Sequence, residues 1–324
     1  MADFFSNYGL FVAELLTLAA IVVFVAVLVT AAAKRSGSQD GLTVEHLNKR
    51  YEGFGDTVRR VVEGAQQRKQ TEKQRRKERK RAAKKGSERK RIFVIDFKGD
   101  IRASATASLR EEVSAILAAA RDDDQVLVRL ENAGGMVHEH GLAASQLLRV
   151  KARGLQLVVA VDKVAASGGY LMACVADRIM AAPFAIIGSI GVIAQLPNFH
   201  RLLEDKGIDF EQVMAGKFKR TLTVFGENTE EGREKLQEEL EEVHRLFKHE
   251  IGEHRPQVDL ERIATGEHWY GMKALELELI DEITTSDDFL LDAVSDHDIY
   301  CVSYKRRRTL PERFLAGAET LLSR

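Results

Sequence analysis

Cysteine is scarce in this chain, with 2 residues among 324. Cys174 and Cys301 lie far apart, and Cys174 sits in an apolar segment where a thiol serves packing. Their number and spacing exclude a disulfide framework and a cysteine-based metal cluster. The sequence therefore predicts neither a metal nor another cofactor, and the thiols do not identify the compartment.

An overall charge of one sign is also lacking, because the formal net charge is -1 although 30% of the residues are charged. Locally the charges are segregated: residues 68–91 form a basic run with QRRKERKRAAKK at its centre. No aromatic residue interrupts this run, so it offers no stacking platform for single-stranded nucleic acid. Two interpretations stand, a solvated helical linker and contact with anionic lipid headgroups at about 1 kcal/mol per basic residue.

Lysine and arginine are absent ahead of the apolar run at residues 15–33. These 19 residues, at about 1.5 Å each, suffice to cross a hydrocarbon core of about 30 Å. A cleaved signal peptide is the alternative, since Ala31 and Ala33 imitate a cleavage site, but the run is longer than usual and lacks a basic flank before it. We expect an uncleaved anchor in the lipid bilayer. Lys34 and Arg35 follow it, which favours a cytoplasmic position for the rest of the chain.

From residue 92 onward, short β-rich runs alternate with helical patterns. Strands are predicted at IFVIDF, VLVRL and LQLVVAV, and helices at residues 109–120 and 141–150. This alternation predicts an α/β domain with a largely parallel sheet. Residues 179–196 are apolar enough to imitate a second membrane span, but Pro183 and Gly188 interrupt them, which favours strand, turn and strand.

Between the anchor and this domain, apolar residues recur every three or four positions over residues 44–61. The pattern predicts a helical seam, with a break at Gly53 and Gly55. The predicted organisation is thus an anchor at residues 1–36, a basic helical linker at 37–91 and the α/β domain at 92–324.

The stretch DKVAASGGY, residues 162–170, reads as a strand end, a short loop and a helix start. Ser167 has two interpretations there. It could be a helix N-cap, because serine oxygens accept the free N–H groups of a first turn. It could instead be a nucleophile at the positive end of a helix, with glycines that let a substrate carbonyl approach backbone N–H groups. The tripeptide alone does not decide between them.

Four stretches taken together carry a family resemblance: ENAGGMV at 131–137, SGGY at 167–170, IIGSIGVI at 186–193 and GKFK at 216–219. In order and spacing they resemble the S49-type peptidases, the SohB and signal peptide peptidase A family. The resemblance spans residues 92–283. It implies a Clp-protease/crotonase-like fold, preceded here by the transmembrane helix and the basic linker.

The resemblance also implies roles for particular residues. Ser167 matches the nucleophile, Lys219 the general base, and Ser189 the serine that orients the lysine amine. Gly134, Gly135 and Gly168 match the backbone that forms the oxyanion hole. A lysine accepts a proton only when its amine is neutral, and burial beside apolar neighbours favours the neutral form.

The implied protein is a membrane-anchored serine endopeptidase that needs no metal or cofactor. Its implied substrates are cleaved signal peptides or other hydrophobic segments near the bilayer. Its implied assembly is a homo-oligomeric ring in which the lysine of one protomer completes the serine of another. The implied location is the bacterial cytoplasmic (inner) membrane. The family favours the extracytoplasmic side for the catalytic domain, whereas the charges favour the cytoplasm.

The sequence departs from the family pattern at two places. Asn132 and Ala133 stand where many members have Ser-Pro, so the geometry of the glycine loop is an open question. Glu278 stands where glycine is usual, so that turn is a second open question.

Three other functions remain as alternatives. A crotonase-type acyl-CoA enzyme would share the oxyanion architecture, and a membrane scaffold would keep the fold with an unused site. A Ser-His-Asp protease would need one of His138, His140, His244 and His249 beside the serine. His244 and His249 are five apart, so they do not share a helix face as zinc ligands, and we expect both on a solvated surface.

Overall fold

The computed structural model of the chain describes residues 17, 41–64, 73, 77 and 89–305. The predicted anchor at 15–33, apart from Thr17, and most of the basic run lie outside these residues. Within the described part, no helix is long and apolar enough to span a membrane.

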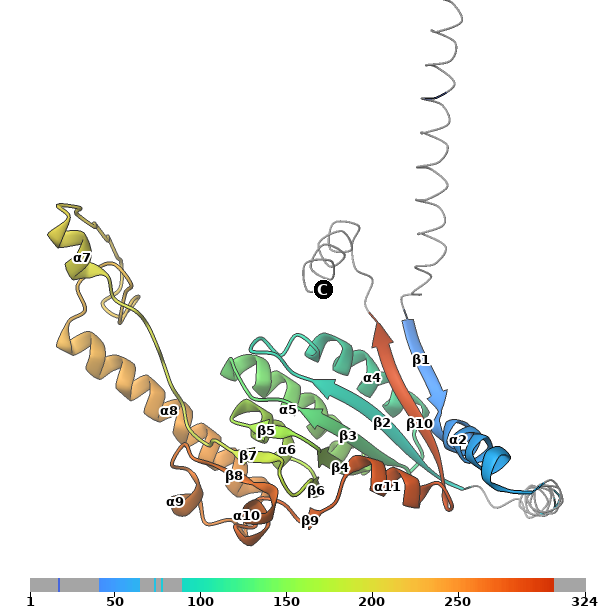
Figure 1. Cartoon of the computed structure of the whole chain (residues 1–324). Coiled ribbons are helices and arrows are strands. Elements are labelled where there is room, and N and C mark those ends of the chain that lie inside the picture. The colour runs from blue at the N-terminus through green and yellow to red at the C-terminus, as the bar shows by residue number, and fades with distance from the viewer. Residues whose placement is uncertain (1–16, 18–40, 65–72, 74–76, 78–88, 306–324) are drawn as a thin grey trace, which may run out of the picture. The chain divides into compact units, whose positions relative to one another are not determined.

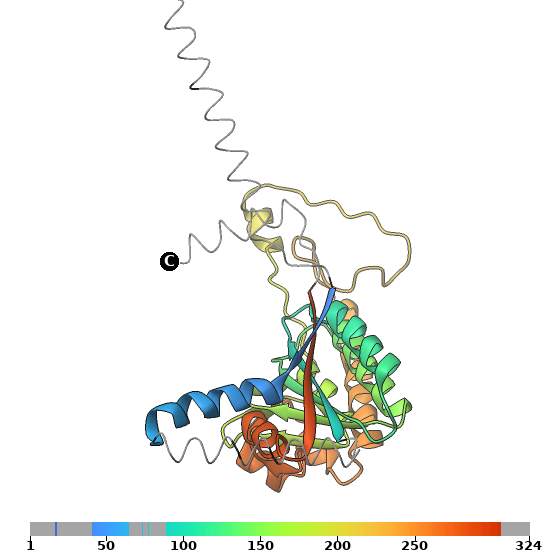
Figure 2. The same cartoon turned by 90° about the vertical axis from the view of Figure 1, so that its right-hand side faces the viewer.

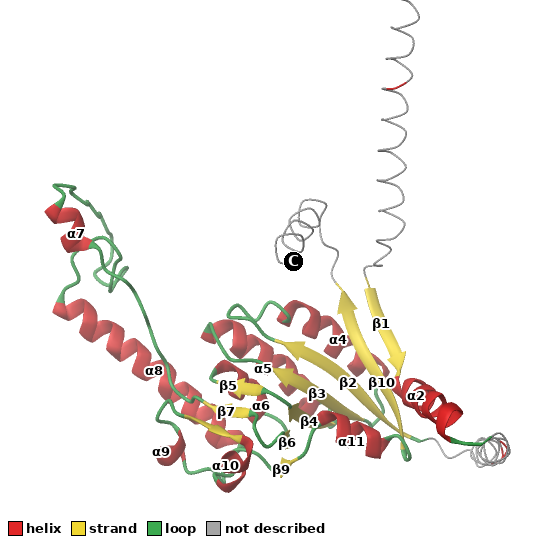
Figure 3. Ribbon diagram, in the orientation of Figure 1, coloured by secondary structure: helices red, strands yellow, loops and turns green. Residues whose placement is uncertain are grey.

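The main element is a seven-stranded sheet in the order β1-β10-β2-β3-β4-β6-β9. The pairs from β10 through β9 are parallel. Its strands are β1 (Gly41–His46), β2 (Lys90–Lys98), β3 (Gln125–Glu131), β4 (Gln156–Val161), β6 (Arg178–Ala181), β9 (Glu282–Ile283) and β10 (His297–Lys305). The strands predicted at IFVIDF, VLVRL and LQLVVAV are therefore confirmed, and so is the α/β class (Figure 3).

Helices cover both faces of this sheet because its strands are apolar on both sides. Along β2, Phe93 and Ile95 pack into one core cluster, whereas Ile92 and Val94 pack into another. The first cluster lies under α4 (Thr106–Ala119), α5 (Val137–Ala152) and α6 (Gly168–Cys174), and the second under α2 (Leu47–Val62) and α11 (Ser286–Ala293). In Figure 2, α2 and α4 lie on opposite sides of the strands. Consecutive residues facing two cores is the pattern expected of parallel sheets.

A second, three-stranded sheet lies beside the first cluster. It pairs β5 (Val164–Ala166) in parallel with β7 (Ile186–Gly188), and β7 antiparallel with β8 (His268–Tyr270). With β6 and β7 in place, the predicted strand, turn and strand at residues 179–196 is confirmed in its first part. Beyond Ile190 the chain leaves the core, and Ile193 is exposed.

The segment before β2 differs from its prediction. Residues 41–46 form strand β1 at the sheet edge beside β10, and the helix runs unbroken from Leu47 through Gly53 and Gly55. Asn48 explains the junction: its amide donates to the His297 carbonyl at 2.8 Å and accepts the Ile299 N–H at 2.7 Å. The boundary between β1 and α2 is therefore set by a contact with the sheet, which the spacing of apolar residues cannot predict.

The chain between β7 and β8 extends away from the sheets. It contains α7 (His200–Asp205), the 25-residue α8 (Glu230–His254) and α9 (Leu260–Ile263). Helix α10 (Gly271–Glu276) follows β8. In Figure 1, α7 lies at the end of α8 that is farther from the sheet. We call residues 192–229 the arm. At its other end α8 is fixed by the buried Arg255, which binds both oxygens of Asp281 and the carbonyl of Glu278.

Glu278 itself adopts the left-handed conformation, with φ +60. This turn therefore has a left-handed backbone although the residue in it is a glutamate.

Candidate active site

Ser167 links β5 to α6 in a single residue. Its backbone has φ +50 and ψ -122, a region that non-glycine residues rarely occupy and that costs about 1–3 kcal/mol. Its N–H donates to the Gly188 carbonyl at 2.7 Å, and its carbonyl accepts the Leu171 N–H at 3.0 Å. Its side chain makes no capping hydrogen bond to α6. Ser167 therefore occupies the N-cap position of α6, but its hydroxyl does not cap the helix and is left without a structural role of that kind.

The glycine loop after β3 packs directly against this turn. A Cβ on Gly134 would lie 2.7 Å from the Ser167 Cβ and 2.9 Å from the Gly168 nitrogen. The Gly134 N–H is engaged, because it donates to Oδ1 of Asn132 at 2.9 Å. Of the three predicted oxyanion residues, Gly134 thus allows the loop to approach Ser167 closely but offers no free N–H group. Gly135 and Gly168 are the two whose N–H groups donate to no acceptor in the described part of the chain.

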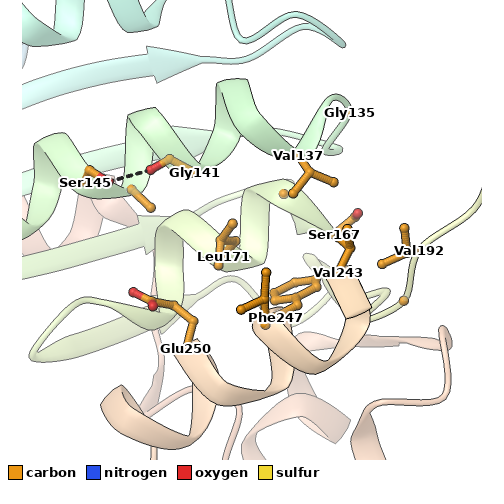
Figure 4. A pocket seen from close by; sticks show the side chains of 14 residues that line it. Gly135, Val137, Gly141, Ser145, Ser167, Leu171, Val192, Val243, Phe247 and Glu250 are labelled. Atoms are coloured by element: carbon orange, nitrogen blue, oxygen red, sulfur yellow. Dashed lines mark hydrogen bonds between the residues drawn. The ribbon is translucent and has the colours of Figure 1, made fainter. Parts of the chain in front are cut away.

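A cavity of about 330 Å³ opens beside Ser167. It runs between α5, α6 and α8, with Ser167 and Val243 near one end and Ser145 and Glu250 near the other (Figure 4). Most of its walls are apolar, contributed by Val137, Ala144, Leu171, Val192, Val243, Leu246 and Phe247. The Glu250 carboxylate lies 3.2 Å from Nε2 of His254 on the next turn of α8. The cavity is suited to an apolar side chain attached to a group held at Ser167.

Ser189, the predicted orienting serine, directly follows Gly188, whose carbonyl holds the Ser167 N–H. It also has a left-handed backbone, with φ +53, and its N–H donates to the Glu267 carbonyl at 2.6 Å. It is partly buried and does not line the cavity. The three-stranded sheet thus holds both serines: Ser167 bonds to Gly188 at the end of β7, and Ser189 bonds to Glu267 just before β8.

Lys219, the predicted base, lies elsewhere in the chain. It is exposed, in the part of the arm between α7 and α8, where its N–H closes a turn onto Gly216 at 3.1 Å. It does not line the cavity at Ser167. Within one copy of the chain, the structure therefore brings Ser167, Gly135, Gly168 and the apolar cavity together and leaves Lys219 apart from them.

Among the described residues, no histidine lines the cavity at Ser167. His138 is exposed beside Glu139, whereas His140 is fully buried. The ring nitrogens of His140 lie 2.9 Å from the Met136 carbonyl and 3.2 Å from Oδ1 of Asn132, so neither is directed to Ser167. His249 is exposed as expected, but His244 is partly buried with Nε2 unpaired in the described chain, so its predicted solvated position is wrong.

Sequence reasoning missed the contribution of Asn132 and His140. Both are buried, at 1% and 0% exposure, and both contact the glycines of the site. The signal in the sequence was that polar residues lie on both sides of the double glycine, Asn132 before it and His140 after it.

The fold and site define an α/β protein with a serine on a strained strand-to-helix turn, free backbone donors and an apolar cavity. Comparison with known families is consistent with that class: the model described as "Peptidase family S49 N-terminal" matches residues 3–147, and "Peptidase family S49" matches 149–299. The chain belongs to peptidase family S49.

Curated relatives cover most of its length. "Probable protease SohB" of Haemophilus influenzae is 48% identical over 98% of this chain and 94% of its own. The protein of the same name from Buchnera aphidicola subsp. Acyrthosiphon pisum is 53% identical over 73% of this chain and 72% of its own. Among solved structures, a mutant of the 1510-N membrane-bound stomatin-specific protease with a substrate peptide has a TM-score of 0.45 at 10% identity, covering 71% of this chain and 98% of that one.

The close approach at Gly134 generates a test. Gly134→Ala would place a Cβ 2.7 Å from the Ser167 Cβ and 2.8 Å from the Ala166 carbonyl oxygen, both on the fixed turn. We expect peptide hydrolysis to fall about 100-fold as the turn is displaced. Gly154→Ala is the matched control, because Gly154 has a similar φ of +82 but nothing within 4 Å of its Cβ position.

Both variants should lose about 1 kcal/mol of stability in thermal unfolding from the left-handed backbone alone. Unimpaired hydrolysis by Gly134→Ala would show that the packing of the loop on Ser167 has no part in the reaction.

Proposed function

We propose that this chain is a membrane-anchored serine endopeptidase that works through a Ser-Lys dyad of Ser167 and Lys219, on a domain of the Clp-protease/crotonase type. One observation carries the serine assignment. Ser167 is held in a strained backbone conformation between two small-residue loops, with a hydroxyl that caps no helix and borders an apolar cavity. Strain of this kind persists where the surroundings impose it, and it concentrates at functional sites.

In the proposed reaction, the Ser167 hydroxyl oxygen attacks the carbonyl carbon of the scissile peptide as the neutral Lys219 amine takes its proton. The oxyanion that forms is stabilised by the N–H groups of Gly135 and Gly168. The C–N bond then breaks, and the leaving amine receives the proton from the lysine. Water, activated by the same amine, hydrolyses the acyl-enzyme and regenerates Ser167. Ser189 is proposed to orient the lysine amine.

We propose that Lys219 reaches Ser167 from a neighbouring copy in a homo-oligomeric ring. Its exposed position on the arm, apart from the cavity, supports a contribution in trans. The arm also exposes several large apolar side chains, which a contact with another subunit would bury. They are Ile208, Phe210, Val213, Met214, Phe218 and Phe225. Stacking of Phe225 against Phe199 and Phe210 keeps the arm ordered with these side chains at its surface. A head-to-tail interface closes into a ring when the rotation between neighbouring subunits divides a full turn, which is the arrangement proposed here.

We propose peptides with apolar side chains as substrates, such as signal peptides or other membrane-proximal segments. The apolar cavity beside Ser167 supports this choice, and so does the apolar run at residues 15–33, which would anchor the domain beside the bilayer. The proposed location is the bacterial cytoplasmic membrane. Protease protection in right-side-out and inverted vesicles would determine the side on which the domain lies.

The trans arrangement predicts complementation between inactive variants. Ser167→Ala and Lys219→Ala should each be inactive, whereas rings mixed from equal amounts of the two should recover about a quarter of wild-type activity, since one interface in four joins an intact serine to an intact lysine. Lys217→Ala is the control for a neighbouring basic residue, and we expect it to stay active. Hydrolysis of a fluorogenic peptide measures the recovery. Mixed rings without activity, with mixing verified by tags, would refute the trans lysine, and an active Ser167→Ala would refute the nucleophile.

The cavity predicts side-chain selectivity. Gly141 lines it, and the Cβ position of Gly141 has nothing within 4 Å, so a side chain can start there and Gly141→Leu would occupy part of the cavity. We expect this variant to lose about tenfold in kcat/KM for peptides with leucine or phenylalanine before the scissile bond and little for alanine. Gly53→Leu, at an equally open helical glycine on α2, is the control. Equal losses for large and small residues would place the substrate side chain elsewhere.

The basic run predicts attachment to anionic lipid. A chain starting at residue 37 should bind vesicles containing phosphatidylglycerol, and binding should weaken with salt. Replacing the seven basic residues of 73–81 by glutamine should abolish most of this binding while peptide hydrolysis persists. Substitution is preferred to truncation because β1 belongs to the sheet. Unchanged vesicle binding would leave the run as a linker.

A further inference from the structure

Asn132 lies at the junction of the two sheets, immediately after β3. Its N–H donates to the Val164 carbonyl at 2.9 Å, and its carbonyl accepts the Ala166 N–H at 3.0 Å. The residue is therefore bonded to the strand that leads into Ser167. Gly169 packs against the same carbonyl so closely that a Cβ there would collide with it. The backbone of Asn132 thus fixes one side of the nucleophile turn.

The side chain of Asn132 fixes the glycine loop. Its Oδ1 accepts the Gly134 N–H at 2.9 Å, and its amide nitrogen faces the sulfur of Met172 at 3.4 Å. The reverse orientation would place the amide N–H groups against the N–H of Gly134, so this network sets the orientation. An asparagine that bonds the backbone two residues ahead forms a local turn. Gly135, whose N–H is free, is the next residue after this turn.

His140 is packed beneath both parts of this arrangement. Its Nε2 lies 3.2 Å from Oδ1 of Asn132, and its Nδ1 lies 2.9 Å from the carbonyl of Met136, which also accepts the His140 N–H. A Cβ added to Gly168 would be 2.5 Å from Cγ of His140, so the imidazole lies directly against that backbone. One fully buried ring therefore contacts, directly or through Asn132, both segments that carry the free N–H groups.

We propose that His140 is a positioning residue for the oxyanion-binding backbone. As the tautomer with its proton on Nε2, the ring donates to Oδ1 of Asn132 and holds the loop that carries Gly135, and by packing under Gly168 it holds the second donor at a fixed separation from the first. This role rests on the proposed function, because it concerns the N–H groups assigned to the oxyanion.

Two substitutions separate the hydrogen bond to Asn132 from simple filling of space. In His140→Gln the amide nitrogen can occupy the position of Nε2 and still donate to Asn132, whereas in His140→Asn it can occupy only the position of Nδ1. We expect His140→Asn to lower kcat about 10- to 100-fold with KM within about twofold, because binding is kept and the oxyanion donors are misplaced. His140→Gln should lose at most about threefold. Peptide hydrolysis by the full-length chain gives both constants, and thermal unfolding gives stability.

A second-site substitution tests the mechanism of the loss. Ala133 is exposed, its N–H donates to no acceptor in the described chain, and Asn132 before it is paired as extended backbone, so proline at position 133 would remove no hydrogen bond and is compatible with the residue before it. Ala133→Pro added to His140→Asn should recover at least about threefold in kcat, because it restores stiffness to the loop without restoring packing.

Two results would overturn the positioning role: wild-type kcat in His140→Asn, or a loss that is equal in the glutamine variant and unrecovered by the proline. Ser167→Ala, measured in parallel, distinguishes the two levels of the proposal. Activity in Ser167→Ala would refute the proposed function, whereas an inactive Ser167→Ala beside a fully active His140→Asn would refute only the positioning role.

Discussion

The turn at Ser167 is the constraint on which the rest of the site depends. The chain must leave a buried strand and enter a buried helix within one residue, which forces a serine into a conformation natural to glycine. The carbonyl of Gly188 holds that residue from one side, and the glycine loop packs against it from the other. Close packing of this kind requires residues without side chains, so the glycines of the SGGY and GG stretches follow from the turn.

The α/β domain was readable from the sequence because its strands and helices are continuous, strongly apolar and locally periodic. At residues 41–64 the helix was readable from Leu47 onward, but the strand before it was not, because that strand exists through pairing with β10, some 250 residues later in the chain. Asn48 records that dependence: its partners, at 294, 297 and 299, are fixed only when the sheet is complete. Apolar spacing at Val44 and Leu47 fits a helix equally well, and nothing local distinguishes the two.

For the site, the sequence motifs located Ser167 and the two glycine stretches, because a strand-loop-helix pattern and the spacing of glycines are local signals. The same motifs do not tell which backbone N–H groups are hydrogen-bonded and which are free. Whether Gly134 or Gly135 keeps a free donor depends on where the Asn132 side chain turns, and that depends on a histidine buried from the next helix. The exposed position of Lys219 on the arm does not follow from its motif, which gives an order along the chain; only the family resemblance implied that the lysine serves another protomer.

Helix α8 joins three regions that are otherwise separate. At its N-terminal end Gly232 packs against the Thr221 carbonyl of the arm, in its middle Val243 and Phe247 form a wall of the cavity, and at its C-terminal end Arg255 is locked to Asp281. A rigid helix that is held at one end pivots when a force acts on its other end. If neighbouring subunits contact one another through the arm, their contact would shift the N-terminal end of α8 and, with it, the residues of α8 that form the cavity wall. The width of a pocket, and hence the side chain it accepts, would then be a collective property of adjoining subunits rather than of a single fold.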